Sequence, residues 1–134
     1  MKAKELMIGD YITFKDCVKE GTILPIKIVA IGYVERGKEN EVLAQIGGDK
    51  TCDVIELDDE CAGIPLTPEI LEKNGFIYSE LPFEQSWQQF GLSLYRGGEG
   101  YRVNCGNNVS AIIDSVNQLQ HLFLLCGIEK EIEL

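Results

Sequence analysis

Short apolar segments alternate with glycine-rich or charged breaks along the first half of the chain. The apolar segments cover residues 11–14, 26–31, 41–46 and 52–57 and are rich in β-branched or aromatic residues. This length and composition are typical of strands. Gly9 and Gly47 predict tight connections, because glycine adopts a positive φ at little cost. Four or five strands this close together predict an SH3-like barrel or half-barrel, since a short meander removes its edges by closing.

The second half begins with a short predicted helix. Thr67 is a good N-cap residue, and Pro68 suits the first helical position, where a missing N–H costs nothing. Glu69 complements the positive end of the helix dipole. Asn74 and Gly75 predict the end of the helix in a left-handed conformation.

Apolar and polar positions recur with a helical period over residues 115–126. Ser115 and Gln118 have the spacing of a capping box, and Gly127 predicts the end of the helix. One stripe carries the apolar residues Val116, Leu119, Leu122, Phe123 and Cys126. We expect this stripe to be buried in the core.

Residues 76–78, 92–96 and 101–105 alternate as strands of a second antiparallel sheet, with an irregular stretch around Trp87. Residues 97–100 are rich in glycine, but a phosphate-binding loop needs a helix after it. Here a strand follows, which favours a hairpin turn. The predicted fold class is therefore α+β, with an SH3-like β subdomain over 1–63 and an α+β subdomain with a C-terminal helix over 64–134, packed as one compact unit.

Charge narrows the range of partners. The 134 residues include 12 basic and 22 acidic side chains, which give a net charge of −10. Such a field repels the phosphates of nucleic acids. No apolar run is long enough for a signal peptide or a membrane span. We therefore expect a cytoplasmic protein whose partner is another protein, with a second copy of the chain as one candidate, and neither nucleic acid nor membrane as a partner.

The five cysteines are odd in number and contain no C-x-x-C pair: Cys17, Cys52, Cys61, Cys105 and Cys126. On a cytoplasmic chain this pattern predicts free thiols and no zinc site. His121 is the only histidine, so a Cys–His nucleophile pair is the one catalytic arrangement left open. The acidic run at residues 56–60 lacks the spacing of a calcium loop. We expect no catalytic residue, no cofactor and no metal.

The second half contains one local cluster of aromatic and basic residues. Trp87, Arg96 and Arg102 are the candidate binding residues, together with the neighbouring Tyr95 and Tyr101. Aromatic residues at alternating strand positions also form core contacts or cross-strand pairs. The cluster therefore has two interpretations, a binding surface or part of the core.

Three segments carry a family resemblance: ELMIGDYI at residues 5–12, PLTPEILEKNGF at 65–76 and QLQHLFLLCGI at 118–128. They resemble a family of short uncharacterised proteins from Bacteroidetes, found in gut commensals and in their phages or mobile elements. The resemblance implies no enzymatic activity. Relatives carry a histidine at the position of Asn117, which would pair with His121 four residues later as a metal-binding H-x-x-x-H motif. Asn117 breaks that pair in this chain.

These observations favour a non-enzymatic protein-interaction module, an accessory protein of a phage or mobile element. A cysteine- and histidine-dependent hydrolase or transferase is the alternative. A nucleic-acid-associated factor is a weaker one, because a small barrel permits it and the charge opposes it.

Overall fold

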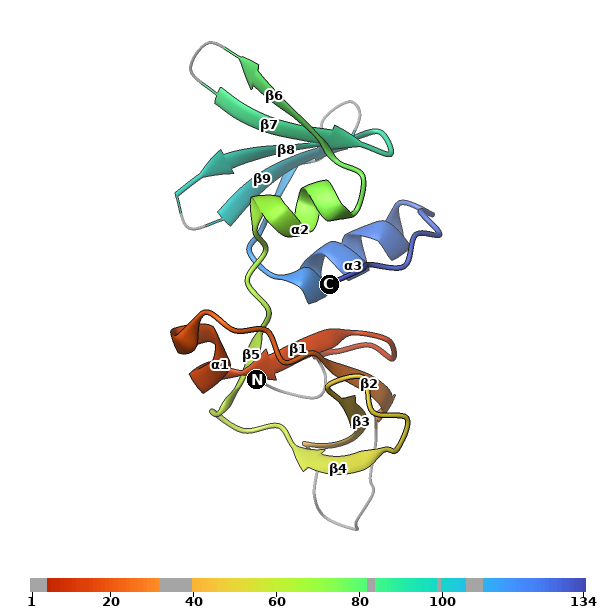
Figure 1. Cartoon of the computed structure of the whole chain (residues 1–134). Coiled ribbons are helices and arrows are strands. Elements are labelled where there is room, and N and C mark those ends of the chain that lie inside the picture. Colours follow the sequence, from red (N-terminus) through yellow and green to blue (C-terminus); the bar gives the residue numbers. More distant parts are fainter. Residues whose placement is uncertain (1–4, 32–39, 82–83, 99, 106–109) are drawn as a thin grey trace. The chain divides into compact units, whose positions relative to one another are not determined.

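The computed structural model describes residues 5–31, 40–81, 84–98, 100–105 and 110–134 (Figure 1). Contacts divide the chain into two units, Met1–Ile64 and Pro65–Leu134. This division lies one residue after the predicted boundary. The predicted α+β class is confirmed, since the described residues form two antiparallel sheets and three helices. No helix in the described part of the chain is long and apolar enough to span a membrane.

The first unit contains a five-stranded antiparallel sheet with the strand order β4-β3-β2-β1-β5. Its elements are β1 (Tyr11–Phe14), α1 (Lys15–Glu20), β2 (Ile26–Ile31), β3 (Glu41–Ile46), β4 (Asp53–Glu56) and β5 (Cys61–Gly63). The four strands predicted here are confirmed to within one residue at each end. The sheet is not closed, because β4 and β5 remain at its edges.

The core of the first unit is aliphatic. It consists of Leu6, Ile12, Ile26, Ile28, Val42, Ala44, Leu57 and Cys61. The register between β2 and β3 shifts between Ile28 and Ala30. Such a bulge bends a strand and increases its twist, which lets the sheet curve around its own side chains.

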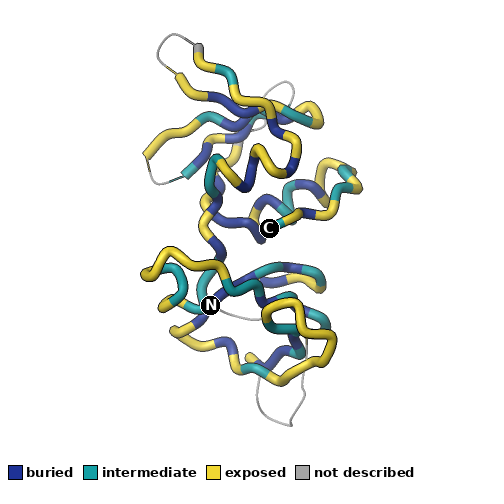
Figure 2. The backbone as a smooth tube through the Cα atoms, in the orientation of Figure 1, coloured by how far each residue is buried: buried dark blue, intermediate teal, exposed yellow. Residues whose placement is uncertain are grey.

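Helix α1 was not predicted, because its sequence KDCVKE has no apolar stripe. None of its residues is buried, as the teal and yellow of this segment in Figure 2 show. Phe14 at the N-cap position makes no side-chain capping bond, and the helix ends at Gly21 with a φ of 71°. The helix therefore adds little to the core.

The second unit combines another five-stranded antiparallel sheet with two helices. Its elements are α2 (Pro68–Lys73), β6 (Ile77–Leu81), β7 (Glu84–Gln89), β8 (Leu92–Gly97), β9 (Gly100–Cys105), β10 (Ser110–Ile113) and α3 (Val116–Leu125). The strand order is β10-β9-β8-β7-β6, a simple meander. The irregular stretch expected around Trp87 is wrong, since Trp87 pairs with Leu94 in the middle of β7.

The predicted hairpin between β8 and β9 is confirmed by the pairing of Gly97 with Gly100. A side chain at Gly100 would meet the carbonyl oxygen of Ile113 at 2.7 Å. Glycine is therefore required where β9 passes close to the end of β10.

Helix α2 begins and ends as predicted. The Thr67 hydroxyl accepts a hydrogen bond from the Ile70 N–H at 3.3 Å, and Gly75 has a φ of 93°. The capping box predicted for α3 is wrong. Ser115 makes no side-chain capping bond, and the Gln118 side chain accepts a hydrogen bond from the Asp114 N–H at 2.8 Å.

The apolar stripe of α3 is buried only in part. Val116, Leu119 and Phe123 are buried and Leu122 is half-buried, but Cys126 is exposed. The prediction for Cys126 is wrong because the helix ends at Leu125, so Cys126 no longer lies on the helical stripe. In Figure 2 the start of α3 is dark blue and its end is largely yellow.

The two faces of the second sheet differ. Strand register places Trp87, Leu94 and Val103 together on one face, and all three are buried. The two helices lie on one side of this sheet (Figure 1). The opposite face carries polar or exposed residues: Ser79, Ser86, Gln88, Ser93, Tyr95, Arg102, Asn104 and Ile112. One face is therefore core, and the other, called here the open face, carries mostly polar or exposed side chains, with Ser86 buried among them.

The segment after α3 is fastened to the end of α2. The buried Asn74 side chain donates to the carbonyl oxygens of Ile70 and Glu133, at 2.8 Å in both cases. Its amide oxygen accepts a hydrogen bond from the Glu133 N–H at 2.7 Å. Ile132, the neighbour of Glu133, is buried. Asn74 thus ends one helix and holds a distant segment.

Candidate functional site

Trp87 belongs to the core. Its side chain is 2% exposed, and its ring lies 5.2 Å from that of Tyr78 and 5.6 Å from that of Tyr101. The indole Nε1 has no hydrogen-bond partner among the described residues. The geometry therefore supports the core interpretation of this aromatic residue.

Arg96 and Arg102 do not form one surface with Trp87. Arg96 pairs with Tyr101 across the sheet, whereas the neighbouring Arg102 points to the opposite face. The Arg102 guanidinium lies 5.1 Å from the centre of the Tyr95 ring and 3.5 Å from the Glu84 carboxylate. Arg102 is thus already engaged on the open face, in a cation–π contact and an exposed ion pair.

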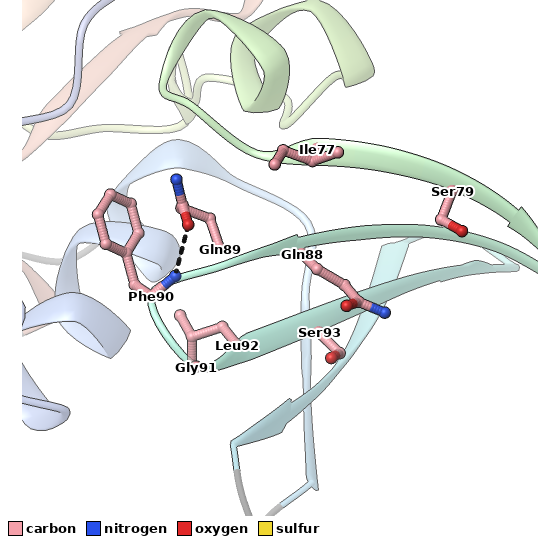
Figure 3. A pocket seen from close by; sticks show the side chains of 8 residues that line it. All are labelled: Ile77, Ser79, Gln88, Gln89, Phe90, Gly91, Leu92 and Ser93. Atoms are coloured by element: carbon pink, nitrogen blue, oxygen red, sulfur yellow. Dashed lines mark hydrogen bonds between the residues drawn. The ribbon is translucent and has the colours of Figure 1, made fainter.

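A pocket of about 440 Å³ lies beside the strands β6, β7 and β8 (Figure 3). Its lining carries no charged side chain and combines polar with apolar residues: Ile77, Ser79, Gln88, Gln89, Phe90, Gly91, Leu92 and Ser93. Hydroxyl and amide groups supply both donors and acceptors, and Ile77 adds an apolar contact. The pocket can therefore accept a side chain that is partly apolar and partly polar.

The turn between β7 and β8 forms one end of this pocket. Phe90 and Gly91 have φ values of 56° and 75°. Two consecutive positive φ values are typical of a type I′ hairpin turn, and a residue such as phenylalanine is rare there. The Phe90 ring lies 6.0 Å from Phe76 and 5.6 Å from Phe123. These aromatic contacts offset the backbone strain and fix the turn.

Strand β6 lies at the edge of the sheet, next to the pocket. It pairs with β7 alone among the described strands. Ile77 is 67% exposed and Tyr78 is 39% exposed. An edge strand presents unpaired backbone N–H and C=O groups to a further strand. The edge and the pocket therefore form one candidate site, called here the β6 edge site and defined by Ile77–Leu81 and the pocket.

Two thiols, Cys61 and Cys126, have a raised pKa, and a raised pKa does not suit nucleophilic catalysis. Burial raises the pKa of Cys61. The Asp58 charge raises it further, whereas a hydrogen bond with the Asp58 backbone lowers it in part. Desolvation raises the pKa of Cys126, and the neighbouring Cys105 thiol adds to the effect. A nucleophilic cysteine needs a lowered pKa. The direction of these pKa shifts therefore disfavours a nucleophilic role for Cys61 and Cys126.

Asn117 and His121 lie on one face of α3 at helical spacing. Asn117 is buried and its Oδ1 has no hydrogen-bond partner among the described residues, whereas His121 is half-buried. No group of three or more potential metal ligands occurs in the described ranges. In the acidic run at 56–60, the Asp58 carboxylate accepts a hydrogen bond from the Glu60 N–H at 2.9 Å, which is an ordinary turn.

The β6 edge site was not predicted from the sequence. A usable signal was present in Ser86, Trp87 and Gln88, where a buried apolar residue stands between two polar ones, as in a strand with one open face. Comparison of the chain with models of protein families, with curated proteins and with solved structures finds no match.

Proposed function

We propose that the protein binds an extended segment of a partner protein along the β6 edge. The observation that carries this proposal is the open edge of β6 beside the pocket. In strand addition, main-chain hydrogen bonds supply affinity and pockets for alternate side chains supply specificity. The β6 edge site offers both elements.

The sequence of β6 lacks the usual protection of an edge. Natural edges carry lysine, proline or a bulge that discourages pairing. Residues Ile77–Leu81 read IYSEL, and no bulge interrupts their pairing with β7. Their exposed apolar groups are suited to a partner.

The negative charge of the chain indicates the charge that a partner segment should carry. Glu80 is exposed on β6, and the whole chain has a net charge of −10. Complementary charge accelerates association and selects among partners. The proposed partner segment therefore contains basic residues flanking an apolar side chain that enters the pocket. A role as an accessory protein of a phage or mobile element is consistent with such binding.

We also propose that the first unit is an SH3-like half-barrel. A four-strand meander whose fifth strand returns beside the first is the strand order of such barrels, and β5 pairs with β1 in this way. The bulge in β2 supplies the bend that a half-barrel needs.

Paired edge substitutions test the proposed binding. Pull-downs from a lysate of the native host should recover a partner with the wild-type chain and lose it with Ile77→Lys, because a charge on this edge opposes a basic segment. Val54→Lys is the matched control, since Val54 is a 49% exposed residue on the edge strand β4. This variant should retain the partner.

Amide hydrogen exchange with the recovered partner locates the contact. Protection should appear over Ile77–Leu81 in the wild-type chain. Equal recovery of the partner by Ile77→Lys, without protection of β6, would contradict the proposal. A concentration-dependent dimer that Ile77→Lys disrupts would identify the partner as a second copy of the chain.

A further inference from the structure

Asn74 is the only asparagine of the chain that precedes a glycine. An asparagine side chain can be attacked by the backbone nitrogen of the next residue, a reaction that makes asparagine thermolabile. Glycine has no side chain to obstruct this nitrogen, and its backbone rotates more freely than that of other residues. Chemistry alone therefore makes Asn74–Gly75 the most reactive pair of this kind in the chain.

Hydrogen bonds in the fold engage both groups that would react. The Asn74 side chain is 1% exposed, and its amide nitrogen donates to the carbonyl oxygens of Ile70 and Glu133 at 2.8 Å in both cases. The backbone N–H of Gly75 donates to the carbonyl oxygen of Glu72 at 3.1 Å. The amide group that must leave and the nitrogen that must attack are thus both held.

The backbone conformation of Asn74 keeps the two groups apart as well. The reaction closes a small ring that contains the Gly75 nitrogen and the Asn74 Cβ, so these atoms must lie nearly in line when viewed along the Cα–C bond. The ψ of Asn74 is 13°, which instead places the Gly75 nitrogen nearly in line with the backbone nitrogen of Asn74. Rotation of ψ would break the Gly75 bond to Glu72, so the end of α2 has to open before the reaction.

We propose that Asn74 is a deamidation site that the folded second unit keeps unreactive and that reacts once the segment after α3 leaves α2. The Gly75 nitrogen loses its proton and bonds to the side-chain carbonyl carbon of Asn74. It displaces the amide group, which takes up a proton and leaves as ammonia. Water then opens the resulting succinimide ring at either carbonyl carbon. The products are aspartate and isoaspartate, and water is consumed and ammonia released in equal amounts.

Neither product can restore the contacts of Asn74. A carboxylate has no N–H to donate, and its charge would face the carbonyl oxygens of Ile70 and Glu133 in a buried position. Isoaspartate also adds an atom to the main chain between α2 and β6. Each molecule that has opened and reacted therefore keeps a permanently weakened contact between α2 and the segment after α3.

Peptide mapping by mass spectrometry, with detection of isoaspartate, measures the reaction in the whole chain. Folded protein and protein unfolded in urea are incubated side by side in mildly alkaline buffer. Asn74 should convert to aspartate and isoaspartate in urea, and at least roughly tenfold more slowly in the folded chain, because only opened molecules react. Equal rates in the two conditions would overturn the proposal.

Two alanine variants of neighbouring residues test the role of the segment after α3. Ile132 is 3% exposed, so Ile132→Ala should loosen this segment and speed the conversion of Asn74 in the folded protein by roughly tenfold. Glu133→Ala is the matched control, because it removes an exposed side chain and keeps the backbone groups that bond to Asn74. This control should react at the wild-type rate. Equal rates in the two variants would show that the segment does not control the reaction.

The isolated deamidated chain gives a second readout that does not depend on the variants. Its melting temperature should lie below that of the unreacted chain, and the backbone amide of Glu133 should exchange its hydrogen faster, because its acceptor on Asn74 is no longer held in place. A deamidated chain that refolds with the melting temperature and the amide exchange of the unreacted chain would overturn the proposal.

Discussion

The two units each contain a five-stranded antiparallel sheet, but they bury their apolar residues in different ways. In the first unit the core is a largely aliphatic cluster of strand and loop residues, and α1 contributes no buried residue. In the second unit α2 and α3 both contribute buried residues, and an aromatic group of Phe76, Phe90 and Phe123 joins α3 to the β7–β8 turn. Helices are structural in one unit and peripheral in the other.

This difference explains where a binding site can form. A sheet that curves around its own side chains uses its inner face for the core. A sheet covered by helices on one face keeps the other face and its edges available for contacts. The open face, the pocket and the unprotected strand β6 all belong to the second unit. The comparison therefore directs functional experiments to residues 65–134.

The largest expected effect tests the role of the helices. Leu119→Ala should lower the free energy of unfolding by about 2 to 5 kcal/mol, because Leu119 is fully buried and its truncation leaves a cavity. Urea denaturation followed by circular dichroism measures this change. In α1, Val18→Ala should cost less than about 1 kcal/mol, since no residue of that helix is buried.

Leu125→Ala is the matched control for Leu119→Ala. Leu125 lies on the same helix but is 84% exposed, so its truncation should leave stability nearly unchanged. A large loss from Val18→Ala, or equal losses at Leu119 and Leu125, would break the comparison between the two units.

A smaller loss of stability is expected when the hydrogen bonds that hold the segment after α3 are removed. Asn74→Ala removes a side chain that is 1% exposed and makes hydrogen bonds to Ile70 and Glu133. Its loss should cost about 2 kcal/mol, because the abandoned backbone groups are poorly hydrated. Asn74→Asp keeps the acceptor for the Glu133 N–H but loses the two donated bonds. Thermal unfolding should rank the wild type above both variants, and an unchanged melting temperature in Asn74→Ala would contradict this role.

The smallest effect distinguishes two buried groups by pH, Cys61 in the first unit and Tyr101 in the second. Burial raises the pKa of Cys61 above its ordinary 9.0 and the pKa of Tyr101 above its ordinary 10.0; the Glu69 charge adds to the shift of Tyr101 and the Arg96 charge opposes it. A raised pKa means that the folded state holds its proton more tightly. Its stabilising contribution is complete below the ordinary pKa and is lost as pH rises through the raised value.

We therefore expect the contribution of Cys61 to stability to be lost above about pH 9 and that of Tyr101 to be lost above about pH 10. Urea denaturation at several alkaline pH values measures the free energy of unfolding. Its fall with pH should be weaker than in the wild type above about pH 9 for Cys61→Ala and above about pH 10 for Tyr101→Phe. The reverse order of the two variants would contradict the assignment.

Local sequence signals predicted much of the fold because the relevant forces act locally. Thr67, Pro68 and Gly75 define α2 by their own backbone preferences, and the structure agrees. The prediction for the stretch around Trp87 was wrong because the strand there depends on pairing with distant parts of the chain. The three glutamines and the single serine of β7 have weak strand preference, and only pairing with β6 and β8 makes this segment a strand.

The candidate site was harder to predict, because it depends on which strand lies at an edge. Trp87, Arg96 and Arg102 are close in sequence, yet strand alternation separates Arg102 from the other two. Ile77 resembles any apolar strand residue until the strand order places it at an edge.

The position of Trp87 has a practical consequence. It is the only tryptophan of the chain, buried in the second unit between two tyrosine rings. Indole fluorescence excited at the red edge of absorption therefore reports on this unit alone, with an emission maximum shifted to the blue by the apolar surroundings. Occupation of the neighbouring edge can be followed in real time through this intrinsic fluorophore without attaching a label.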